Sequence, residues 1–278
     1  MGKVIDINYF ELFIGYALLL IPVFVFWYYK TGLVKDTLFA SFRMTIQLLL
    51  VGVYLEYIFK LDSIWVNIAW VLVMALIGAY TIIQRSGLRY KMFIVPILLS
   101  GLISIAVSDA YFLGFVVKLD NIFNARYFIP VTGMLLGNTI KNVVISLNAY
   151  YKRIDDQQTM YRWYLANGAS REEALLPFMR HALRIAFNPL IATTAIMGLI
   201  SLPGMMTGQI LGGSNPNVAV KYQIMLLITI FSSAILNVVL AIYFSNKISF
   251  DGYSNLKKDI FRPKKELALS RDKLTISR

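Results

Sequence analysis

The sequence lacks several residues and motifs from which chemical sites are commonly built. It has no cysteine, which excludes disulfide bonds, thiolate metal sites and a cysteine nucleophile. It has one histidine, His181, so a histidine-rich metal site is excluded, and a lone histidine is more often structural than a ligand. No G-x-x-x-x-G-K-[ST] sequence occurs, which excludes a P-loop. We therefore predict that the chain is not an enzyme and holds neither a metal nor a cofactor of its own.

Charged residues are also scarce, at 15% of the 278 residues, whereas 58% are hydrophobic. Soluble domains are nearer to about 45–50% apolar, so the composition indicates a membrane protein. A membrane helix needs about 20 mostly apolar residues, and seven segments qualify: 9–29, 37–59, 64–83, 92–113, 127–149, 187–206 and 221–245. We predict an all-α membrane protein with seven transmembrane helices in a transmembrane domain, 1–245, and a basic cytoplasmic tail, 246–278. The tail is expected to form a juxtamembrane helix followed by disorder.

The net charge is +12. The basic residues are distributed along the chain as in a membrane protein rather than as in a nucleic-acid-binding protein. Of the 27 lysines and arginines, 20 lie in four segments that share one side of the membrane if the N-terminus is outside: 30–36, 84–91, 150–186 and the chain from 246 onward. Only five lie in the segments on the other side. Because cytoplasmic loops carry the excess of Lys and Arg, we predict that the N-terminus is outside and the C-terminus inside. The expected surroundings are membrane lipid, with no nucleic acid.

The loop 150–186 is the one long connection, and long loops in compact proteins are usually functional. The Asp155–Asp156 pair is expected to cap a first helix that stops near Asn167–Gly168, a sequence typical of a left-handed helix end. Ser170 followed by Glu173 predicts a capping box at the start of a second helix. Two interpretations stay open: a hairpin lying on the membrane, and a coupling element that docks onto another protein.

Two cations fall inside predicted spans, Arg43 and Lys141. Ionisable groups at membrane depth usually mark a transport pathway, although a lysine near the boundary also snorkels to the interface. Amides accompany them, with Gln47 one turn above Arg43 and Asn138 and Asn142 beside Lys141. We expect these five residues to line a substrate pathway. Their chemistry suits an anionic solute better than a bare metal cation, which prefers carboxylate oxygens.

The stretch SLPGMMTGQILGG, Ser201 to Gly213, is rich in glycine but has no nearby basic residue. Pro203 is expected to break the sixth span, and Gln209 to face the pathway at its outer end. Small residues at four-residue spacing let helices approach closely in lipid, and two such sets occur: Gly204, Gly208 and Gly212 here, and Gly133 and Gly137 in the fifth span. The alternative is a plain packing motif that does not contact substrate.

Three stretches together are typical of one family: LANGASREEALLPFMRHALRIAFNPLIATTAIMGLISLPGMMTGQILGG from Leu165, GMLLGNTI from Gly133 and AVKYQIM from Ala219. They resemble the iron-export ABC permease family, the FetB-like permeases, to which plant aluminium-tolerance permeases are related. The resemblance covers most of the chain and implies a plasma-membrane, multi-pass permease subunit of an ABC transporter, acting in iron export and metal homeostasis. It also implies a homodimer driven by a separate ATPase subunit, which would bind ATP and Mg.

The resemblance implies that the corner at Gly168, Ala169 and Ser170, with Glu173 behind it, couples the permease to that ATPase. Such permeases usually carry an acidic residue a few positions before the glycine, whereas this chain has Arg162 there, which is expected to replace that contact. The expected cargo is iron, or an anionic metal complex or nucleotide-sugar-type solute. The alternative is a stand-alone secondary transporter of an anionic solute, which inverted repeats would support; none is evident.

Overall fold

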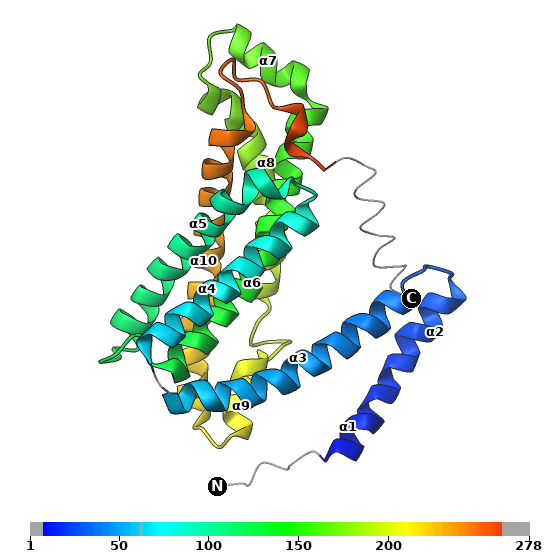
Figure 1. Ribbon diagram of the computed structural model, residues 1–278, viewed down its shortest axis with the longest axis vertical. Helices are drawn as coiled ribbons and strands as arrows, with labels where there is room; N and C mark the ends of the chain where they lie inside the picture. Colours follow the sequence, from blue (N-terminus) through cyan, green and yellow to red (C-terminus); the bar gives the residue numbers. More distant parts are fainter. Residues whose placement is uncertain (1–7, 62, 263–278) are drawn as a thin grey trace.

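The computed structural model describes residues 8–61 and 63–262, and their regular structure is helical, with only isolated β-bridges. Six helical stretches are long and apolar enough to cross a membrane: Phe10–Tyr28, Val34–Leu61, Ile64–Ser86, Tyr90–Val116, Ala125–Asp156 and Pro216–Ser249. The prediction of an all-α membrane protein is therefore confirmed. The helices form a tilted bundle from which the first hairpin projects (Figure 1).

Five helices make the bundle. They are α4 (Ile64–Ser86), α5 (Tyr90–Asp109, continued by the π-helix η2, Ala110–Val116), α6 (Ala125–Asp156), α8 (Arg171–Ala195) and α10 (Pro216–Ser249). α6 is central, since α4, α5, α8 and α10 all pack against it. Its buried residues recur at helical spacing along nearly its whole length.

α5 and α10 meet through small residues. Ser104 of α5 and Ser233 of α10 are both buried, and the Ser104 hydroxyl donates to the Ser233 carbonyl over 2.7 Å. Small side chains continue the contact at four-residue spacing on both helices: Ser100, Ser104 and Ser108 on α5, and Ser233, Asn237, Ala241 and Ser245 on α10. Because lipid supplies no hydrophobic force between helices, such close approach and hydrogen bonding hold membrane helices together.

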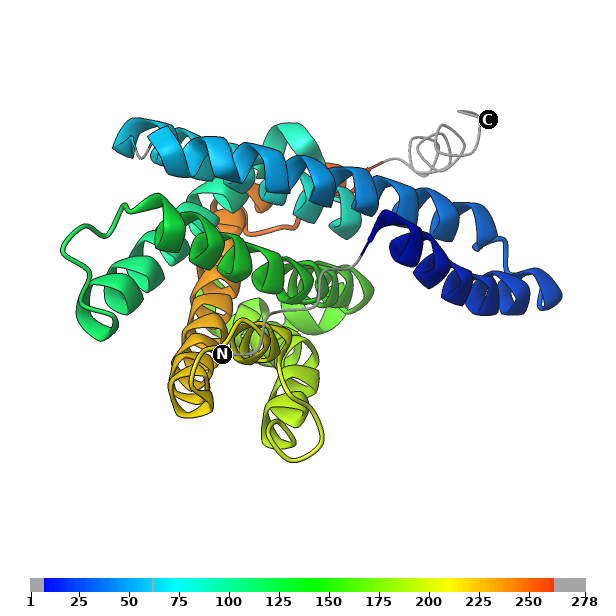
Figure 2. The same cartoon turned by 90° about the horizontal axis from the view of Figure 1, so that it is seen from below.

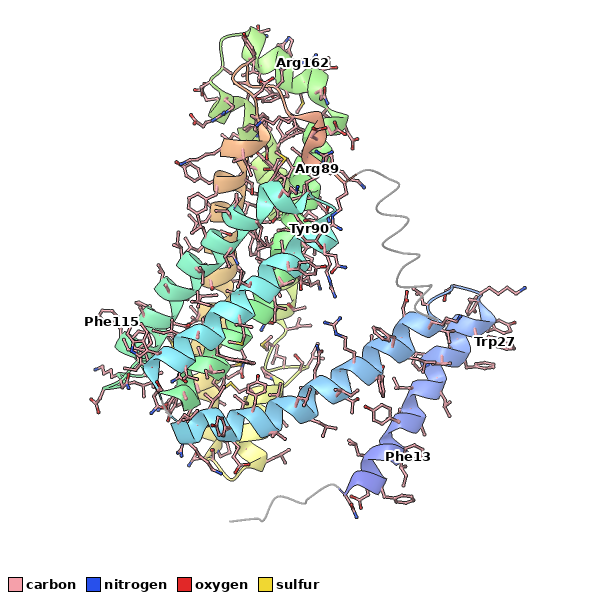
Figure 3. The ribbon with its side chains drawn as sticks, viewed as in Figure 1. Phe13, Trp27, Arg89, Tyr90, Phe115 and Arg162 are labelled. Atoms are coloured by element: carbon pink, nitrogen blue, oxygen red, sulfur yellow. The ribbon has the colours of Figure 1, made fainter. Side chains whose placement is uncertain are left out.

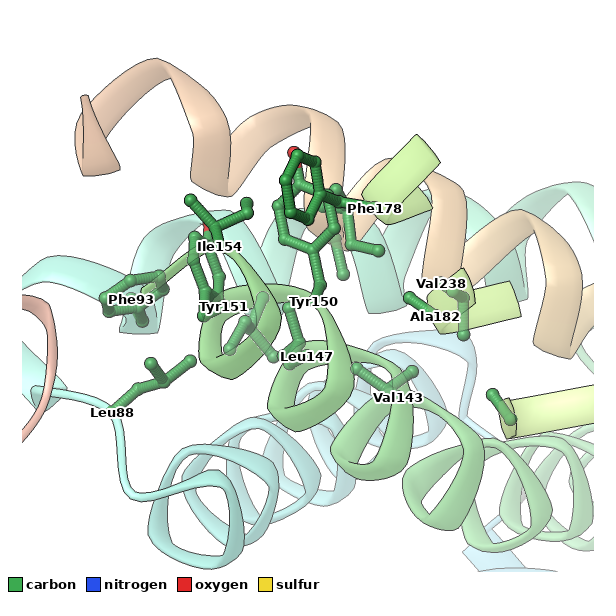
Figure 4. Packing of buried hydrophobic residues seen from close by; sticks show 14 of the residues in the cluster. Leu88, Phe93, Val143, Leu147, Tyr150, Tyr151, Ile154, Phe178, Ala182 and Val238 are labelled. Carbon is green, nitrogen blue, oxygen red and sulfur yellow. The ribbon is translucent and has the colours of Figure 1, made fainter. Parts of the chain in front are cut away.

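Aromatic side chains fill the core where the start of α5 meets the ends of α6 and α10 (Figure 4). Tyr150 and Tyr151 of α6 are almost fully buried, with Phe93 of α5 edge-on to Tyr151. The Tyr151 hydroxyl shares a 2.9 Å hydrogen bond with Ser249 of α10, and the Asn246 side chain of α10 donates to the Tyr150 hydroxyl over 2.8 Å. This layer joins three helices through both packing and hydrogen bonds.

The first hairpin is an arm that leaves the bundle. It comprises α1 (Tyr9–Gly15), the 3-10 turn η1 (Tyr16–Leu19), α2 (Leu20–Tyr28) and α3 (Val34–Leu61). Only the end of α3 reaches the bundle, where Ile58 packs with Ala125 and Ile129. Seen from below, the rest of the arm lies to one side (Figure 2), and its apolar side chains are largely exposed.

The sixth predicted span, 187–206, is not one helix. α8 ends at Ala195, a tight turn follows in which Gly198 has φ +88°, and α9 (Gly204–Leu211) begins after Pro203. The hydroxyls of Thr193 and Thr194 bond back to carbonyls one turn earlier, a pattern that weakens and bends helices. Through α8, this turn and α9, the chain still passes from the α7 end of the bundle to the other end (Figure 1).

The last long helix, α10, continues past residue 246 to Ser249. Residues 250–262, which we name the C-terminal strap, fold back over the end of the bundle, and the expected juxtamembrane helix is represented there by the short 3-10 helix η3 (Lys258–Ile260). The strap packs against the bundle because this buries the side chains of Phe250 and Ile260. The disorder predicted for the tail concerns residues 263–278, which lie outside the described residues.

The serine contact between α5 and α10 gives a test of the bundle. Replacing Ser104 with Leu should destabilise the protein by about 1–3 kcal/mol, because a larger side chain overpacks a fully buried contact. Thermal unfolding in detergent measures this, with Val107→Leu on the exposed face of α5 as the control. If both substitutions leave the unfolding temperature unchanged, the two helices are not closely packed at this point.

Candidate functional site

The 150–186 loop forms the hairpin predicted from the sequence, with one correction. Asp155 and Asp156 do not cap a new helix, because α6 runs on through Asp156, and α7 (Gln158–Ala166) starts only after Gln157. The corner is as expected: α7 ends at Ala166 with Asn167 as its C-cap, and Gly168 follows with φ +87°. Glycine is the residue that adopts this conformation without steric cost.

The start of α8 carries the predicted capping box. The Ser170 hydroxyl accepts from the Glu173 backbone N–H over 3.3 Å, and the Ser170 backbone N–H donates to the Glu173 carboxylate over 2.7 Å. Hydrogen bonds from the backbone and hydroxyl of Ser170 lower the pKa of Glu173 below its ordinary value. The corner is therefore a fixed turn, held from both sides of Gly168 and Ala169.

α7 has one buried and one exposed side. Tyr161 is buried, and its hydroxyl donates to the Ser254 carbonyl of the strap over 2.8 Å; burial raises the pKa of this tyrosine. The neighbouring Arg162 and Trp163 are exposed, Trp163 by 60%. Arg162 lies at the extreme end of the molecule (Figure 3). An exposed tryptophan beside an arginine is a composition enriched where proteins bind other proteins.

The strap connects the hairpin to the turn between α4 and α5. The Arg89 backbone N–H donates to the Ile260 carbonyl, and the Arg262 backbone N–H donates to the Gly87 carbonyl, both over 3.0 Å. The Arg262 guanidinium lies 3.9 Å from the centre of the Tyr90 ring. Three segments that the charge distribution assigned to one side of the membrane, 84–91, 150–186 and the chain after 246, thus meet at one end.

The pathway residues predicted on α6 divide between two faces. Asn138 and Lys141 are exposed beside Gly137, whereas Asn142 is buried in the bundle. The open face continues toward both ends of α6 at helical spacing, through residues that are at least partly exposed: Pro130, Met134, Gly137, Asn138, Lys141, Ile145, Asn148 and Lys152.

A cavity of about 340 Å³ lies at the η2 end of this open face. Gln209 of α9 lines it together with Arg126, Met134, Met205 and Tyr222. Gln209 therefore lies beside α6 in the lining of this cavity, and its predicted role in a substrate pathway stays a prediction. The cavity joins η2, α6, α9 and α10, and its lining residues extend from Phe112 to Leu226.

Arg43 and Gln47 are not brought to this face by contacts within the described residues. Both are exposed on the part of α3 that belongs to the arm. The two sets of pathway residues that the sequence suggested thus lie on different parts of one chain.

The predicted packing glycines line open surfaces within one chain. A side chain at Gly133, Gly137, Gly204 or Gly208 would meet nothing within 4 Å among the described residues, and at Gly212 it would meet only carbonyls of its own turn. Pro203 is the N-cap of α9. Close packing inside the protomer is carried by the α5–α10 serines instead.

The structure also buries an acid, Asp109, that is not among the site residues predicted from the sequence. Asp109 is only 2% exposed, and Thr132 donates to its Oδ2 over 2.6 Å. Its Oδ1 has no hydrogen-bond partner among the described residues. The serine repeat that precedes it on α5 was the signal that this side of the helix faces the bundle.

The capping box predicts an acid-sensitive corner. Because the folded pKa of Glu173 is depressed, its capping contribution is complete above the unfolded value of 4.5 and is lost as pH falls through the folded pKa. Hydrogen-exchange protection at the first turn of α8 should decline over that range, and Glu173→Gln should abolish the pH step. Glu172→Gln should keep it, and a pH step that survives Glu173→Gln would contradict the assignment.

The chain matches the family described as "Uncharacterised protein family (UPF0014)" over residues 9–250. It is 28% identical over 257 residues to "UPF0014 membrane protein YjkA" of Bacillus subtilis (91% of this chain, 99% of the relative). It is 34% identical over 215 residues to "Probable iron export permease protein FetB" of Escherichia coli (77% and 81%) and 29% over 232 residues to "Protein ALUMINUM SENSITIVE 3" of Arabidopsis thaliana (82% and 82%). No solved structure matches the chain. The chain belongs to the UPF0014 family of membrane permeases, and the resemblance to the FetB-like permeases is confirmed.

Proposed function

We propose that this chain is the membrane-spanning permease subunit of an ABC transporter, driven by a separate ATPase subunit that binds ATP and Mg. The observation that carries the proposal is the α7–α8 hairpin. The 32 residues of α6 extend about 48 Å at 1.5 Å per residue, whereas the hydrocarbon core of a bilayer is about 30 Å thick. α6 therefore projects beyond the bilayer and carries the capped corner to where a soluble partner can reach it.

The chemistry of the hairpin supports its role as the coupling element. Arg162 and Trp163 face outward, while Tyr161 anchors the opposite side of α7 to the strap. Gly168, Ala169, Ser170 and Glu173 form the rigid corner behind them. A push on this corner would reach α8 directly, because α8 begins there, and would reach α6 through α7, which follows α6 after a single residue.

We further propose seven crossings, with the N-terminus outside and the C-terminus inside. Six are the apolar helices, and the seventh is the broken path of α8, its turn and α9. The meeting of three positively charged segments at the hairpin end supports this orientation. Cargo moving outward would then leave at the end where Gln209 lines its cavity.

The open face of α6 is our candidate for the substrate pathway. It presents Asn138 and Lys141 at its middle and leads to the Gln209 cavity. One relative is named as a probable iron export permease, and a lysine with amides suits an anion. The proposed cargo is therefore iron carried as an anionic complex, or a related anionic solute, moved outward.

A homodimer would complete this pathway. Gly133 and Gly137 of α6, where an added side chain would meet nothing within 4 Å, and the exposed arm leave surfaces that a second copy can cover. In such a dimer Arg43 and Gln47 of the arm, and the open glycines Gly204 and Gly208 of α9, would meet the partner. Asn142 would act from inside the bundle by fixing the face that carries Lys141.

Gly168→Val tests the coupling assignment. A β-branched residue resists the left-handed backbone at this corner, so the variant should insert into membranes but lose ATPase binding or stimulated ATP turnover. Ser170→Ala, which costs about 1 kcal/mol locally, should be milder.

Trp163→Ala should also weaken ATPase binding, with Trp65→Ala as the control, because Trp65 is also exposed but lies at the start of α4. Co-purification of the ATPase with the permease from membranes measures ATPase binding for both pairs of variants, Gly168→Val with Ser170→Ala and Trp163→Ala with Trp65→Ala. Intact ATPase binding and transport in Gly168→Val would make the hairpin passive. Transport by the chain without any ATPase would instead favour a secondary transporter.

Lys141→Ala tests the charge of the cargo. If an anion passes along α6, efflux should fall about tenfold or more, the factor that a lost interaction of about 1.4 kcal/mol produces. Lys141→Arg should retain most of the activity, and Lys221→Ala, exposed on α10, should be neutral. Iron efflux from loaded cells is the measurement. Faster efflux in Lys141→Ala would mean that a bare cation is carried.

A further inference from the structure

A second cavity opens at the hairpin end of the α6 face. It has a volume of about 580 Å³ and lies between α6 and α8. Its lining is Ile145, Asn148, Ala149, Lys152, Arg153, Asp156, Gln157, His181 and Ile185. Neither the coupling corner nor the Gln209 cavity includes any of these residues.

Three of the lining side chains can carry positive charge. The Arg153 Nε donates to the Gln157 side chain over 3.2 Å, which fixes the guanidinium while leaving its two terminal nitrogens directed elsewhere. Lys152, exposed, lies beside it, and neither cation forms an ion pair among the residues that the structure describes. His181 faces them from α8, where burial first and then the Arg153 charge lower its pKa. Asp156 is the one acid in the lining.

The lining changes character along the helix axis. Ile145, Ala149 and Ile185 form its apolar part, which lies toward the membrane, and Lys152 and Arg153 lie further out. From Ile145 to Asp156 the rise is about 16 Å, so the cavity crosses from the predicted span into the region beyond it. An apolar groove that ends in cations matches a molecule with an acyl chain and an anionic head.

We propose that this cavity binds the phosphate group of an anionic phospholipid. Lys152 and Arg153 would contact the phosphate, with Asn148 and His181 as further hydrogen-bonding groups, and the acyl chain would lie along Ile145 and Ile185. Basic pockets between transmembrane helices on the cytoplasmic side are where such head groups bind, and this placement rests on the orientation proposed above. A soluble phosphate ester shares the head-group chemistry but leaves the apolar lining unused.

The lipid would tie α6 to α8 at the base of the coupling hairpin. Both helices contribute to the cavity. α6 leads into α7 of the hairpin, and α8 is the second helix of the hairpin. Bound lipid would therefore stabilise the hairpin relative to the bundle. The consequence is an ATPase-coupled permease whose efficiency depends on the anionic lipid content of its membrane.

Native mass spectrometry of the full chain in detergent measures the binding. Phosphatidylglycerol should bind at least tenfold more tightly than phosphatidylcholine, and Lys152→Gln with Arg153→Gln should remove that preference. The matched control is Arg85→Gln with Lys91→Gln, which removes two exposed charges at the same end but outside the cavity. A third titration uses inorganic phosphate alone.

The proposal is overturned if the cavity double variant keeps the preference for phosphatidylglycerol, or if the control loses it equally. Binding of inorganic phosphate as tight as that of the lipid, abolished by the same double variant, would show a site for a soluble phosphate instead. The readout requires no ATPase, so its failure is separate from failure of the coupling assignment, which the Gly168→Val variant tests.

Discussion

The buried tyrosine pair of α6 is the contact on which the rest of the hairpin end depends. Tyr150 and Tyr151 both fill the core, and the hydroxyl of each forms a hydrogen bond with α10. Tyr150 bonds to Asn246, and Tyr151 bonds to Ser249. Buried hydroxyls without partners would be costly in this apolar setting, so the two hydrogen bonds fix the rotation of α6 relative to α10. That rotation in turn decides which face of α6 stays open.

Because α6 is continuous, one rigid element connects the proposed coupling corner with the proposed pathway. Lys141 lies ten residues before Tyr151, about 15 Å along the axis. The strap adds a second connection, from the hairpin to the α4–α5 turn. Movement of the corner would therefore be shared by α4, α5 and α6, while the contact of α3 with the bundle lies at the far end.

Local signals predicted local structure well. The capping box at Ser170 and the left-handed Gly168 follow from side-chain and backbone chemistry within four residues, and the structure has both. The extension of α6 to Asp156 and the strap were missed because they depend on burying Ile154, Phe250 and Ile260 against distant residues. The burial of Asp109 likewise depends on Thr132 of another helix, which no single-helix pattern reveals. The polar residues proposed for the pathway were chosen by their chemical type, and only the folded α6 separates exposed Lys141 from buried Asn142.

The most direct test of the account is site-specific photo-crosslinking in native membranes, with the photoreactive residue placed at Arg162 or at Phe115. The two positions lie toward opposite ends of the molecule and both side chains are exposed (Figure 3). The account predicts an adduct with an ATP-binding subunit from position 162 and none from position 115. No such adduct from position 162, or an adduct from position 115, would contradict the assignment of the α7–α8 hairpin as the coupling element.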